Sequence, residues 1–164
     1  MQRIVRCQAA IVQNDHLLLS KSNDRVSGKT FWLIPGGGQE SNETEEECIA
    51  REVCEETHLS VEVKDLLLDE QAPADGTYQR LKTYRCRILS GEARPGIEPE
   101  ADVEITICEI GWFDMHNPAT WDRLVLNDSI TSPVVRYRGK DIEQSADLTS
   151  YYERSYPHRA SANL

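Results

Sequence analysis

The stretch that decides the fold runs from residue 35 to residue 59 and reads PGGGQESNETEEECIAREVCEETHL. Three glycines follow a proline, and glycine lets the backbone take positive φ angles and approach neighbouring chain closely. Thr44 and Glu47 then form the pattern of a capping box, in which each side chain bonds the other residue's backbone N–H. We therefore predict a tight glycine segment followed by a helix over residues 44–57.

The apolar residues of this helix indicate which face it buries. Ile49 and Val53 lie one turn apart, and so do Ala50 and Cys54. We therefore expect these four residues to pack against the rest of the domain.

The last two turns of the same helix concentrate negative charge on one face. Glu52 lies three residues before Glu55 and four before Glu56, and both spacings bring carboxylates together. Like charges at these spacings weaken a helix, and the helix dipole also disfavours negative charge in the last turn. A bound cation is one physical reason to keep these carboxylates. For a glutamate-rich helix in general, the alternative is a solvated acidic face.

The ligand chemistry of this cluster favours a hard divalent cation. Carboxylate oxygens suit Mg²⁺ or Mn²⁺ better than they suit softer metals. Arg51 directly precedes the cluster and can hold one carboxylate through a fork-shaped contact. A backbone carbonyl from the glycine segment, residues 36–38, can reach the same ion. The residues alone thus predict a magnesium or manganese site between the glycines and the helix.

The spacing over residues 37–59 resembles the signature of the Nudix (MutT-like) hydrolase family, Gly-x5-Glu-x7-Arg-Glu-apolar-x-Glu-Glu-x-Gly-apolar. The matching positions are Gly37, Glu43, Arg51, Glu52, Val53, Glu55, Glu56 and Leu59. The pattern departs from the family at His58, where glycine is usual, and at Asn42, where many members also have glycine. Glycine after a helix usually supplies a left-handed turn. The departure at His58 therefore concerns the exit of the helix more than its acidic cluster.

The resemblance implies a fold, a reaction and a role for each matching residue. The fold is α/β (α+β), with an α/β/α sandwich around a mixed β-sheet. The reaction is metal-dependent hydrolysis of a nucleoside diphosphate linked to another moiety, with Glu52 as the alternative base that activates water. The implied catalytic residues are Glu52, Arg51 and Glu43, of which the last two brace the helix and the loop, and the implied metal-binding residues are Gly37, Glu52, Glu55 and Glu56. A further carboxylate often comes from a later segment in this family, and the candidates here are Glu98, Glu100, Asp102 and Glu104.

The remaining chain alternates apolar and polar residues in the manner of β-strands. We expect strands at residues 3–12, 16–22, 31–34, 60–71, 77–89 and 103–113, a turn at Asn14-Asp15, a polar loop over 22–30 and a helix from Asn117-Pro118. This order predicts a mixed sheet with helices on its faces. We assign residues 1–138 to a Nudix domain and residues 139–164 to a polar extension that packs on the same domain or leaves it.

The segment RLKTYRCR, residues 80–87, places four basic side chains in an acidic protein. On a strand, Arg80 and Lys82 point one way, while Arg85 and Arg87 point the other. One of these pairs can meet substrate phosphates, or the charges can protect an exposed sheet edge. The aromatic candidates for stacking on a base are Tyr78, Tyr84, Trp32 and Trp112. We take Arg80, Lys82, Arg85 and Tyr84 as the predicted substrate-binding residues.

The bulk composition excludes several classes of function. The chain has 164 residues and a net charge of −10, which argues against general binding to duplex nucleic acid. A small anionic nucleotide remains compatible, because divalent cations bridge acidic protein to phosphate. No apolar run is long enough to cross a bilayer, and the N-terminus does not have the form of a signal peptide. Five cysteines without a Cys-x2-Cys pair indicate reduced thiols in a cytoplasmic protein.

We therefore predict a cytoplasmic Mg²⁺-dependent pyrophosphohydrolase with a small-molecule nucleotide substrate, and take a homodimer as the default assembly. Within that class we favour a nucleotide sugar such as ADP-ribose, since some ADP-ribose-cleaving family members carry a proline where Pro73 stands. A nucleoside triphosphate or dinucleoside polyphosphate is an alternative substrate. A non-catalytic nucleotide-binding regulator and a domain whose acidic helix docks a basic partner are the alternatives from other classes.

Overall fold

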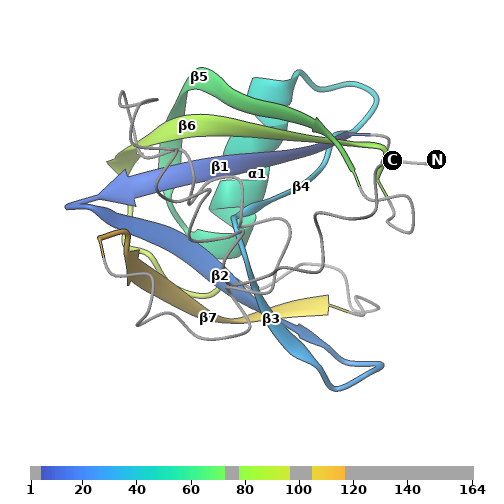
Figure 1. The fold of residues 1–164 in the computed structure, drawn as a ribbon, viewed down its shortest axis with the longest axis vertical. Helices are drawn as coiled ribbons and strands as arrows, with labels where there is room; N and C mark the ends of the chain where they lie inside the picture. Colours follow the sequence, from blue (N-terminus) through green and yellow to red (C-terminus); the bar gives the residue numbers. More distant parts are fainter. Residues whose placement is uncertain (1–4, 73–77, 97–104, 117–164) are drawn as a thin grey trace, which may run out of the picture.

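The computed structural model describes residues 5–72, 78–96 and 105–116. These residues form seven strands and one helix (Figure 1). In chain order they are β1 (Val5–Gln13), β2 (His16–Asp24), β3 (Thr30–Leu33), β4 (Gly36–Gly38), α1 (Glu45–Thr57), β5 (Ser60–Gln71), β6 (Arg80–Ser90) and β7 (Ile105–Asp114). None of the helical structure in the described part of the chain is long and apolar enough to cross a membrane.

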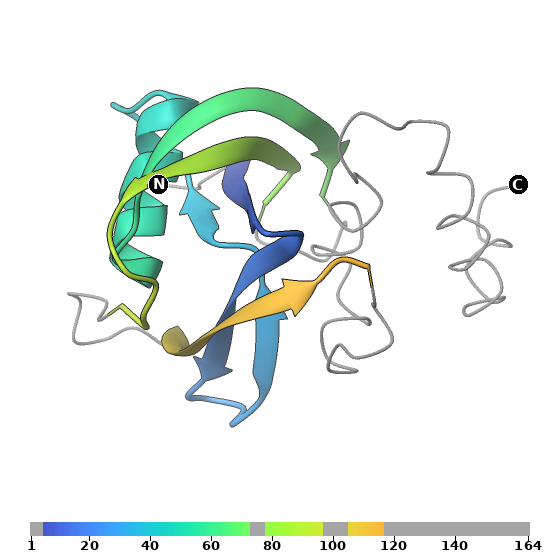
Figure 2. The same ribbon diagram turned by 90° about the vertical axis from the view of Figure 1, so that its left-hand side faces the viewer.

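The strands form one mixed sheet in the order β3-β2-β1-β6-β5, with β4 paired to β1 and β7 paired to β2. The pair β1–β6 is parallel, and the other pairs are antiparallel. Helix α1 lies against the part of the sheet made by β1, β5 and β6 (Figure 2). The predicted mixed sheet with a packed helix is confirmed. The second helix, expected from residue 117, lies outside the described residues, as does the segment 139–164.

The central strand β1 is buried on both faces. For this reason apolar and polar residues do not alternate strictly along its sequence. One core cluster joins residues of β1 to the underside of α1: Cys7, Ala9, Ile11, Leu18, Cys48, Ile49, Val53, Leu59, Val61 and Cys86. A second cluster lies on the other side of β1: Ala10, Leu17, Leu19, Trp32, Ile34 and Met115. The site described below forms where β4 brings the glycine segment between β1 and α1.

The turn between β1 and β2 agrees with the sequence prediction. Asn14 and Asp15 both take positive φ angles, of 50° and 60°, and they join strands in which Gln13 pairs with His16. Two consecutive residues with positive φ are the mark of a two-residue hairpin turn, and asparagine and aspartate tolerate that conformation. The turn thereby sets the register of β1 and β2.

Several predicted boundaries and faces were wrong. Strand β2 continues to Asp24, so the polar loop predicted over 22–30 is shorter, because the segment still pairs with β3 and β7. The glycine segment, which the sequence pattern did not assign to a strand, forms the short strand β4. Ala50 and Cys54 are exposed, since the buried face of α1 runs through Cys48, Ile49, Glu52, Val53, Glu56 and Thr57. The strand predicted over residues 103–113 alternates apolar and polar residues, which predicts that Ile105 and Ile107 share a buried face. In β7, Ile107 is buried but Ile105 is 42% exposed.

Candidate active site

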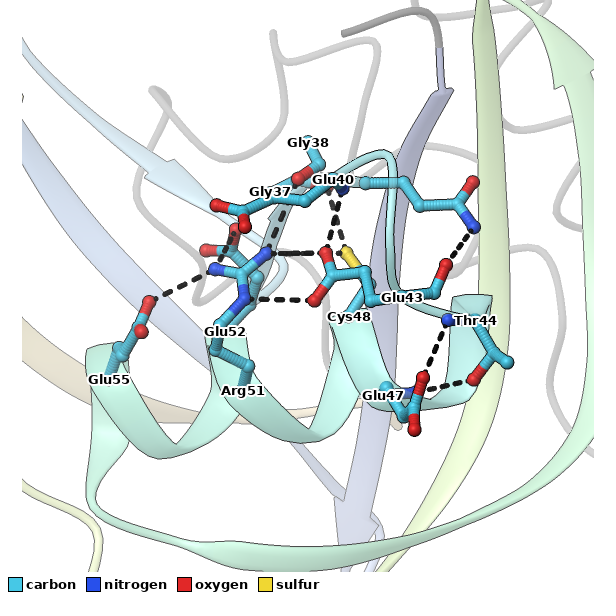
Figure 3. Close-up of polar contacts among 11 residues, drawn as sticks. Gly37, Gly38, Glu40, Glu43, Thr44, Glu47, Cys48, Arg51, Glu52 and Glu55 are labelled. Atoms are coloured by element: carbon cyan, nitrogen blue, oxygen red, sulfur yellow. Dashed lines mark hydrogen bonds and ion pairs between the residues drawn. The ribbon is translucent and has the colours of Figure 1, made fainter.

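Helix α1 begins at a complete capping box, as its sequence predicts (Figure 3). The Thr44 hydroxyl accepts from the Glu47 backbone N–H at 3.2 Å, and the Glu47 carboxylate accepts from the Thr44 backbone N–H at 2.8 Å. These two bonds satisfy donors that a helix start otherwise leaves open. The start of the helix, and hence the position of every carboxylate along it, is fixed by local sequence.

The helix ends in a left-handed residue, which is His58 where the family usually has glycine. His58 has φ 59° and ψ 17°, and its backbone N–H donates to the carbonyl of Cys54 at 3.0 Å. This is the geometry that glycine supplies in the same place. A histidine at positive φ is less favourable than glycine but is tolerated. The helix therefore ends in the usual left-handed conformation, although histidine stands in place of glycine.

Strand β4 lies close to α1 because its residues have no side chains. A Cβ atom at Gly37 would overlap the carboxylate of Glu52. Gly36 has φ 149°, and a Cβ atom there would overlap the backbone of Cys7 and Gln8 in β1. Only glycine permits this approach. The Gly37 carbonyl oxygen lies 3.8 Å from Cys48 Sγ, so it faces the helix.

Arg51 is the centre of the polar network in Figure 3. Its guanidinium donates to both carboxylate oxygens of Glu43, at 2.7 and 3.1 Å. It also donates to Glu52 at 2.8 Å and to Glu55 at 3.2 Å. A further donation reaches the carbonyl of Gly38 at 3.4 Å. One arginine thus ties the glycine segment, the loop before the helix and two of the predicted metal-binding carboxylates together.

Glu43 and Arg51 stabilise each other's charged forms. The Arg51 guanidinium, which donates two hydrogen bonds, lowers the pKa of the Glu43 carboxyl to about 2. The same hydrogen bonds raise the pKa of Arg51 above its ordinary value. Fork-shaped contacts of this kind combine charge with fixed orientation. The contact that a brace requires is thus present, and the bracing role itself stays a prediction.

Glu52 and Glu56 are buried carboxyls one turn apart. Glu52 is 9% exposed, and burial raises its pKa, although the nearby Arg51 opposes that shift. Glu56 is 8% exposed, and burial raises its pKa to about 8. Glu56 accepts from the Ser20 hydroxyl at 3.0 Å and from the backbone N–H of Gly36. Burying carboxyl groups with so few donors is costly unless a proton or a cation is bound.

The residues present fit a hard divalent cation in donor type and in charge. In the described residues no three Asp, Glu, His or Cys side chains converge as a preassembled metal site. The Arg51 guanidinium holds Glu52 and Glu55, and Glu55 is the most exposed of the three carboxylates, with 39% of its side chain accessible. The oxygen donors adjacent to the Gly37 carbonyl have the chemistry that Mg²⁺ and Mn²⁺ take. The roles of Gly37, Glu52, Glu55 and Glu56 as ligands stay predictions.

The predicted substrate-binding residues of β6 all have acidic partners. Lys82 and Tyr84 both bond Glu45 at the start of α1, away from the end of the helix that carries Glu56. The remaining pairs are between neighbouring strands: Arg80 with Asp69, Arg85 with Asp65, and Arg87 with Glu62. Substrate binding by Arg80, Lys82, Arg85 and Tyr84 stays a prediction. The candidates for an additional carboxylate ligand, residues 98 to 104, lie outside the described residues.

Two residues near the carboxylates were not found from the sequence. Ser20 on β2 is 1% exposed and bonds Glu56. Arg6 on β1 is 8% exposed. Burial raises the pKa of Glu52 and of Glu56, and the positive charge of Arg6 opposes that rise. Both come from strands far from the signature in sequence. A serine in an apolar strand and an arginine beside a cysteine carry no local pattern that marks them, so only the tertiary fold identifies them.

Comparisons with known proteins agree with this geometry. The model of the NUDIX domain matches residues 4–129. The putative nudix hydrolase 1 of Caenorhabditis elegans is 28% identical over 141 residues, which are 86% of this chain and 32% of the relative. The putative 8-oxo-dGTP diphosphatase 2 of Mycobacterium tuberculosis is 40% identical over 67 residues, which are 38% of this chain and 45% of the relative. The chain thus spans about a third to a half of the length of these curated relatives.

Solved structures show the same fold. A crystal structure of an ADP-ribose pyrophosphatase from Streptococcus suis has a TM-score of 0.59 and 22% identity, covering 84% of this chain and 94% of its own. A NUDIX hydrolase from Nitrosomonas europaea has a TM-score of 0.62 and 23% identity, covering 84% of this chain and 70% of its own. With the signature in place on α1 and the domain model matched over most of the sequence, the chain belongs to the Nudix hydrolase family.

Proposed function

We propose that this protein is a divalent-metal-dependent pyrophosphohydrolase. It cleaves the diphosphate linkage in a nucleoside diphosphate joined to another moiety. The observation that carries this proposal is the set of three carboxylates at the end of α1, two of them buried, against a glycine strand that leaves no space for side chains. Buried polar groups are nearly always paired, and a bound cation would offset the cost of burying these carboxylates.

Each residue of the site has a defined part in this proposal. Glu52, Glu55, Glu56 and the Gly37 carbonyl hold the ion, and Glu52 is the alternative base that takes a proton from the attacking water. When bound, Mg²⁺ or Mn²⁺ screens the diphosphate charge and lowers the pKa of water. Arg51 and Glu43 keep the carboxylates in place before substrate binds, which reduces the reorganisation needed during the reaction.

A nucleotide sugar such as ADP-ribose is the first candidate substrate. The Streptococcus suis protein that shares the fold is described as an ADP-ribose pyrophosphatase. The proline that favours this substrate, Pro73, lies outside the described residues. In this proposal one face of β6 contacts phosphates, either through Arg80 and Lys82 or through Arg85, and Tyr84 stacks on the base. Each residue must first leave its acidic partner. That exchange predicts a modest contribution from each residue.

A nucleoside triphosphate or dinucleoside polyphosphate is the second candidate substrate. The Mycobacterium tuberculosis relative, which is named as a putative 8-oxo-dGTP diphosphatase, has the higher identity of the two curated relatives over a shorter stretch. A non-catalytic regulator is disfavoured because all three carboxylates of the signature are retained.

The proposed compartment is the cytoplasm, where the five cysteines stay free thiols. The proposed assembly is a dimer.

The test is a product screen over nucleotide sugars, triphosphates and dinucleotides with Mg²⁺ and with Mn²⁺. We expect a nucleoside monophosphate among the products from at least one class, and no turnover after chelation. The matched control is Glu46→Gln, which removes an exposed carboxylate of the first turn of α1 and leaves the site intact. Absence of metal-dependent turnover and of metal-dependent thermal stabilisation together would contradict the proposal.

A further inference from the structure

Ser20 on β2 is a buried hydroxyl that follows an apolar run. Leu17, Leu18 and Leu19 are each 0% exposed, and Ser20 is 1% exposed. A hydroxyl at such a position must find a hydrogen-bond partner inside the protein, because burial removes it from water. Its partner is the Glu56 carboxyl of α1, 36 positions away in the chain. A small apolar side chain at position 20 would leave no polar group to satisfy, so the hydroxyl points to a role at Glu56.

The single hydrogen of this hydroxyl has two acceptors within reach. Ser20 Oγ lies 3.0 Å from Glu56 Oε2 and 3.4 Å from the carbonyl oxygen of Leu33, which is opposite Ser20 in the β2–β3 register. A hydroxyl can donate to only one of them at a time. A carboxylate is the stronger acceptor, because a hydrogen bond to a charged group is shorter and roughly twice as strong as one between neutral groups. The Ser20 hydroxyl therefore donates to Glu56 in preference to Leu33.

The Glu56 carboxyl accepts from donors on two separate strands. Besides Ser20 of β2, the backbone N–H of Gly36, the first residue of β4, donates to it. That N–H is closely confined, since a Cβ atom at Gly36 would overlap the backbone of Cys7 and Gln8. A carboxylate has about four lone-pair positions on its two oxygens, so two donors leave positions for a cation. Of the two donors, the serine hydroxyl is the one that a side-chain substitution removes.

Glu56 differs from the other two carboxylates of the cluster in the kind of donor that it has. Glu52 and Glu55 both accept from the Arg51 guanidinium, at 2.8 and 3.2 Å. The donors to Glu56 are a neutral hydroxyl and a neutral backbone N–H. The charge of Arg6 acts on Glu52 as well as on Glu56, so it does not distinguish them. Neutral donors orient a carboxylate without adding a positive charge that repels a metal ion. The Glu56 carboxylate is therefore oriented and still available to a cation.

We propose that Ser20 is a positioning residue for the divalent cation. Its hydroxyl holds Oε2 of Glu56, which fixes the orientation in which this carboxylate meets the ion. The inference rests on the proposed function, since it takes the ion to be bound by Glu56. Ser20 touches neither the ion nor the substrate, so its own burial is no obstacle, and the ion enters beside Glu55, whose side chain is 39% accessible. Hydrogen-bond donors to a ligating carboxylate contribute roughly ten- to a hundredfold to metal affinity.

The first experiment titrates the nucleotide-free protein with Mn²⁺ and measures the free ion by electron paramagnetic resonance. Ser20→Ala should weaken Mn²⁺ binding by roughly tenfold or more. Ser20→Thr keeps the hydroxyl and should recover most of that affinity. Ser22→Ala is the matched control, because Ser22 lies on the same strand and is 2% exposed, and it should bind Mn²⁺ as the wild type does. Thermal melts with a chelator should be similar for both alanine variants, which separates a loss of metal affinity from a loss of the fold.

The second experiment asks whether Ser20 acts through Glu56. Glu56→Gln removes the charge of the proposed ligand, so adding Ser20→Ala to it should weaken Mn²⁺ binding no further. Two independent effects would instead multiply, and a further loss of roughly tenfold in the double variant would contradict the inference. In a turnover assay, the activity of Ser20→Ala should recover at saturating Mn²⁺, because the hydroxyl takes no part in the reaction itself.

The outcomes separate this inference from the hydrolase proposal, because Mn²⁺ binding needs no turnover. Unchanged Mn²⁺ affinity in Ser20→Ala, or an equal loss in Ser22→Ala, would overturn the positioning role and leave the hydrolase proposal standing. Mn²⁺ binding that depends on Ser20, in a protein that cleaves none of the screened substrates, would support the positioning role and count against the proposed hydrolysis. A wild-type protein that binds no Mn²⁺ would overturn both.

Discussion

Two groups of charged residues in this molecule are chemically alike and structurally different. The arginine network on α1 joins Arg51 to Glu43, Glu52 and Glu55. The charge ladder on β5 and β6 consists of the pairs Arg80–Asp69, Arg85–Asp65 and Arg87–Glu62. Both pair arginines with carboxylates at hydrogen-bond distance. In the network the Arg51 side chain is 27% exposed and serves three acids, whereas the ladder arginines are 53% to 63% exposed and serve one acid each.

Burial and the number of partners decide what an ion pair does. Exposed single pairs contribute little, because water and salt screen them and two long side chains lose freedom. In a buried network, loss of one member leaves the others uncompensated, so the members depend on each other. The ladder has a different use, since charged residues on β5, the last strand in the sheet order, disfavour pairing with another chain.

The largest expected effect is on catalysis at the end of α1. Glu56→Gln and Glu55→Gln each remove one carboxylate from the proposed ion, so turnover should fall by roughly a hundredfold or more, as when one charge-stabilising group leaves an active site. Steady-state assays with Mg²⁺ measure this loss, and circular dichroism confirms that the fold is kept. The matched variant in the ladder, Glu62→Gln, should leave kcat and KM unchanged. Full activity in either of the α1 variants would refute the assigned role of that residue.

The second effect is on stability and separates the network from the ladder directly. Arg51→Ala leaves Glu43 and Glu52 without their main cation, so the free energy of unfolding should fall by about 3 kcal/mol, the lower end of the range for breaking a buried pair. Arg87→Ala should give no measurable change, because the Arg87 side chain is 63% exposed. Urea unfolding of both variants measures the difference. Equal losses in the two variants would mean that burial does not distinguish the two groups.

The sequence predicted the parts of the fold and of the site that depend on the spacing of residues close together in the chain. The capping box, the two-residue turn at Asn14 and Asp15 and the strand over residues 60–71 all follow from near neighbours in the chain, and the structure has each of them. Arg51 and Glu43, eight residues apart, were predicted as a brace because the family signature links them. Their contact in the structure uses both oxygens of Glu43.

The parts that the sequence did not predict depend on distant contacts. The buried face of α1 was misjudged because Glu52 and Glu56 are buried there in place of the apolar Ala50 and Cys54. A buried glutamate breaks the usual hydrophobic pattern, and functional sites are where such breaks are expected. Ser20 contacts Glu56 across 36 positions in the chain, so no local pattern marks it.

The third effect is a pH dependence carried by Glu56. The pKa of this carboxyl is about 8 in the folded protein, above its ordinary value of 4.5. Unfolding between these two pH values releases a proton, so stability of the metal-free protein should fall as pH rises from 4.5 to about 8. Glu56→Gln removes this contribution and should stabilise the metal-free protein at pH 8, on the order of a few kcal/mol at most. At pH 4.5 the variant and the wild type should melt alike.

Thermal melts across pH in the presence of a chelator measure this effect. Glu62→Gln is again the control from the ladder, because the pKa of Glu62 is lowered by its hydrogen bonds to Lys64 and Arg87. A lowered pKa gives stability that is lost as pH falls, which is the opposite sign. An unchanged slope between pH 5 and 8 in Glu56→Gln would show that Glu56 is not the group responsible.

The smallest effect concerns the ladder itself and decides between its two predicted uses. If Arg80 and Arg85 only pair with the acidic residues of the outer strand β5, replacing both by glutamine should shift the melting temperature by less than about 2 °C and leave KM unchanged. If they also contact substrate phosphates, KM should rise severalfold while kcat stays the same, since such contacts stabilise the bound substrate and the transition state equally. Raising the salt concentration should reduce that KM difference, because exposed charges are screened. An Arg87→Gln variant removes one positive charge, as each single variant Arg80→Gln or Arg85→Gln does, without a predicted substrate contact. A rise in KM that is absent from Arg87→Gln would therefore assign substrate binding to Arg80 and Arg85 specifically, and an equal rise would assign it to the net charge of the strand.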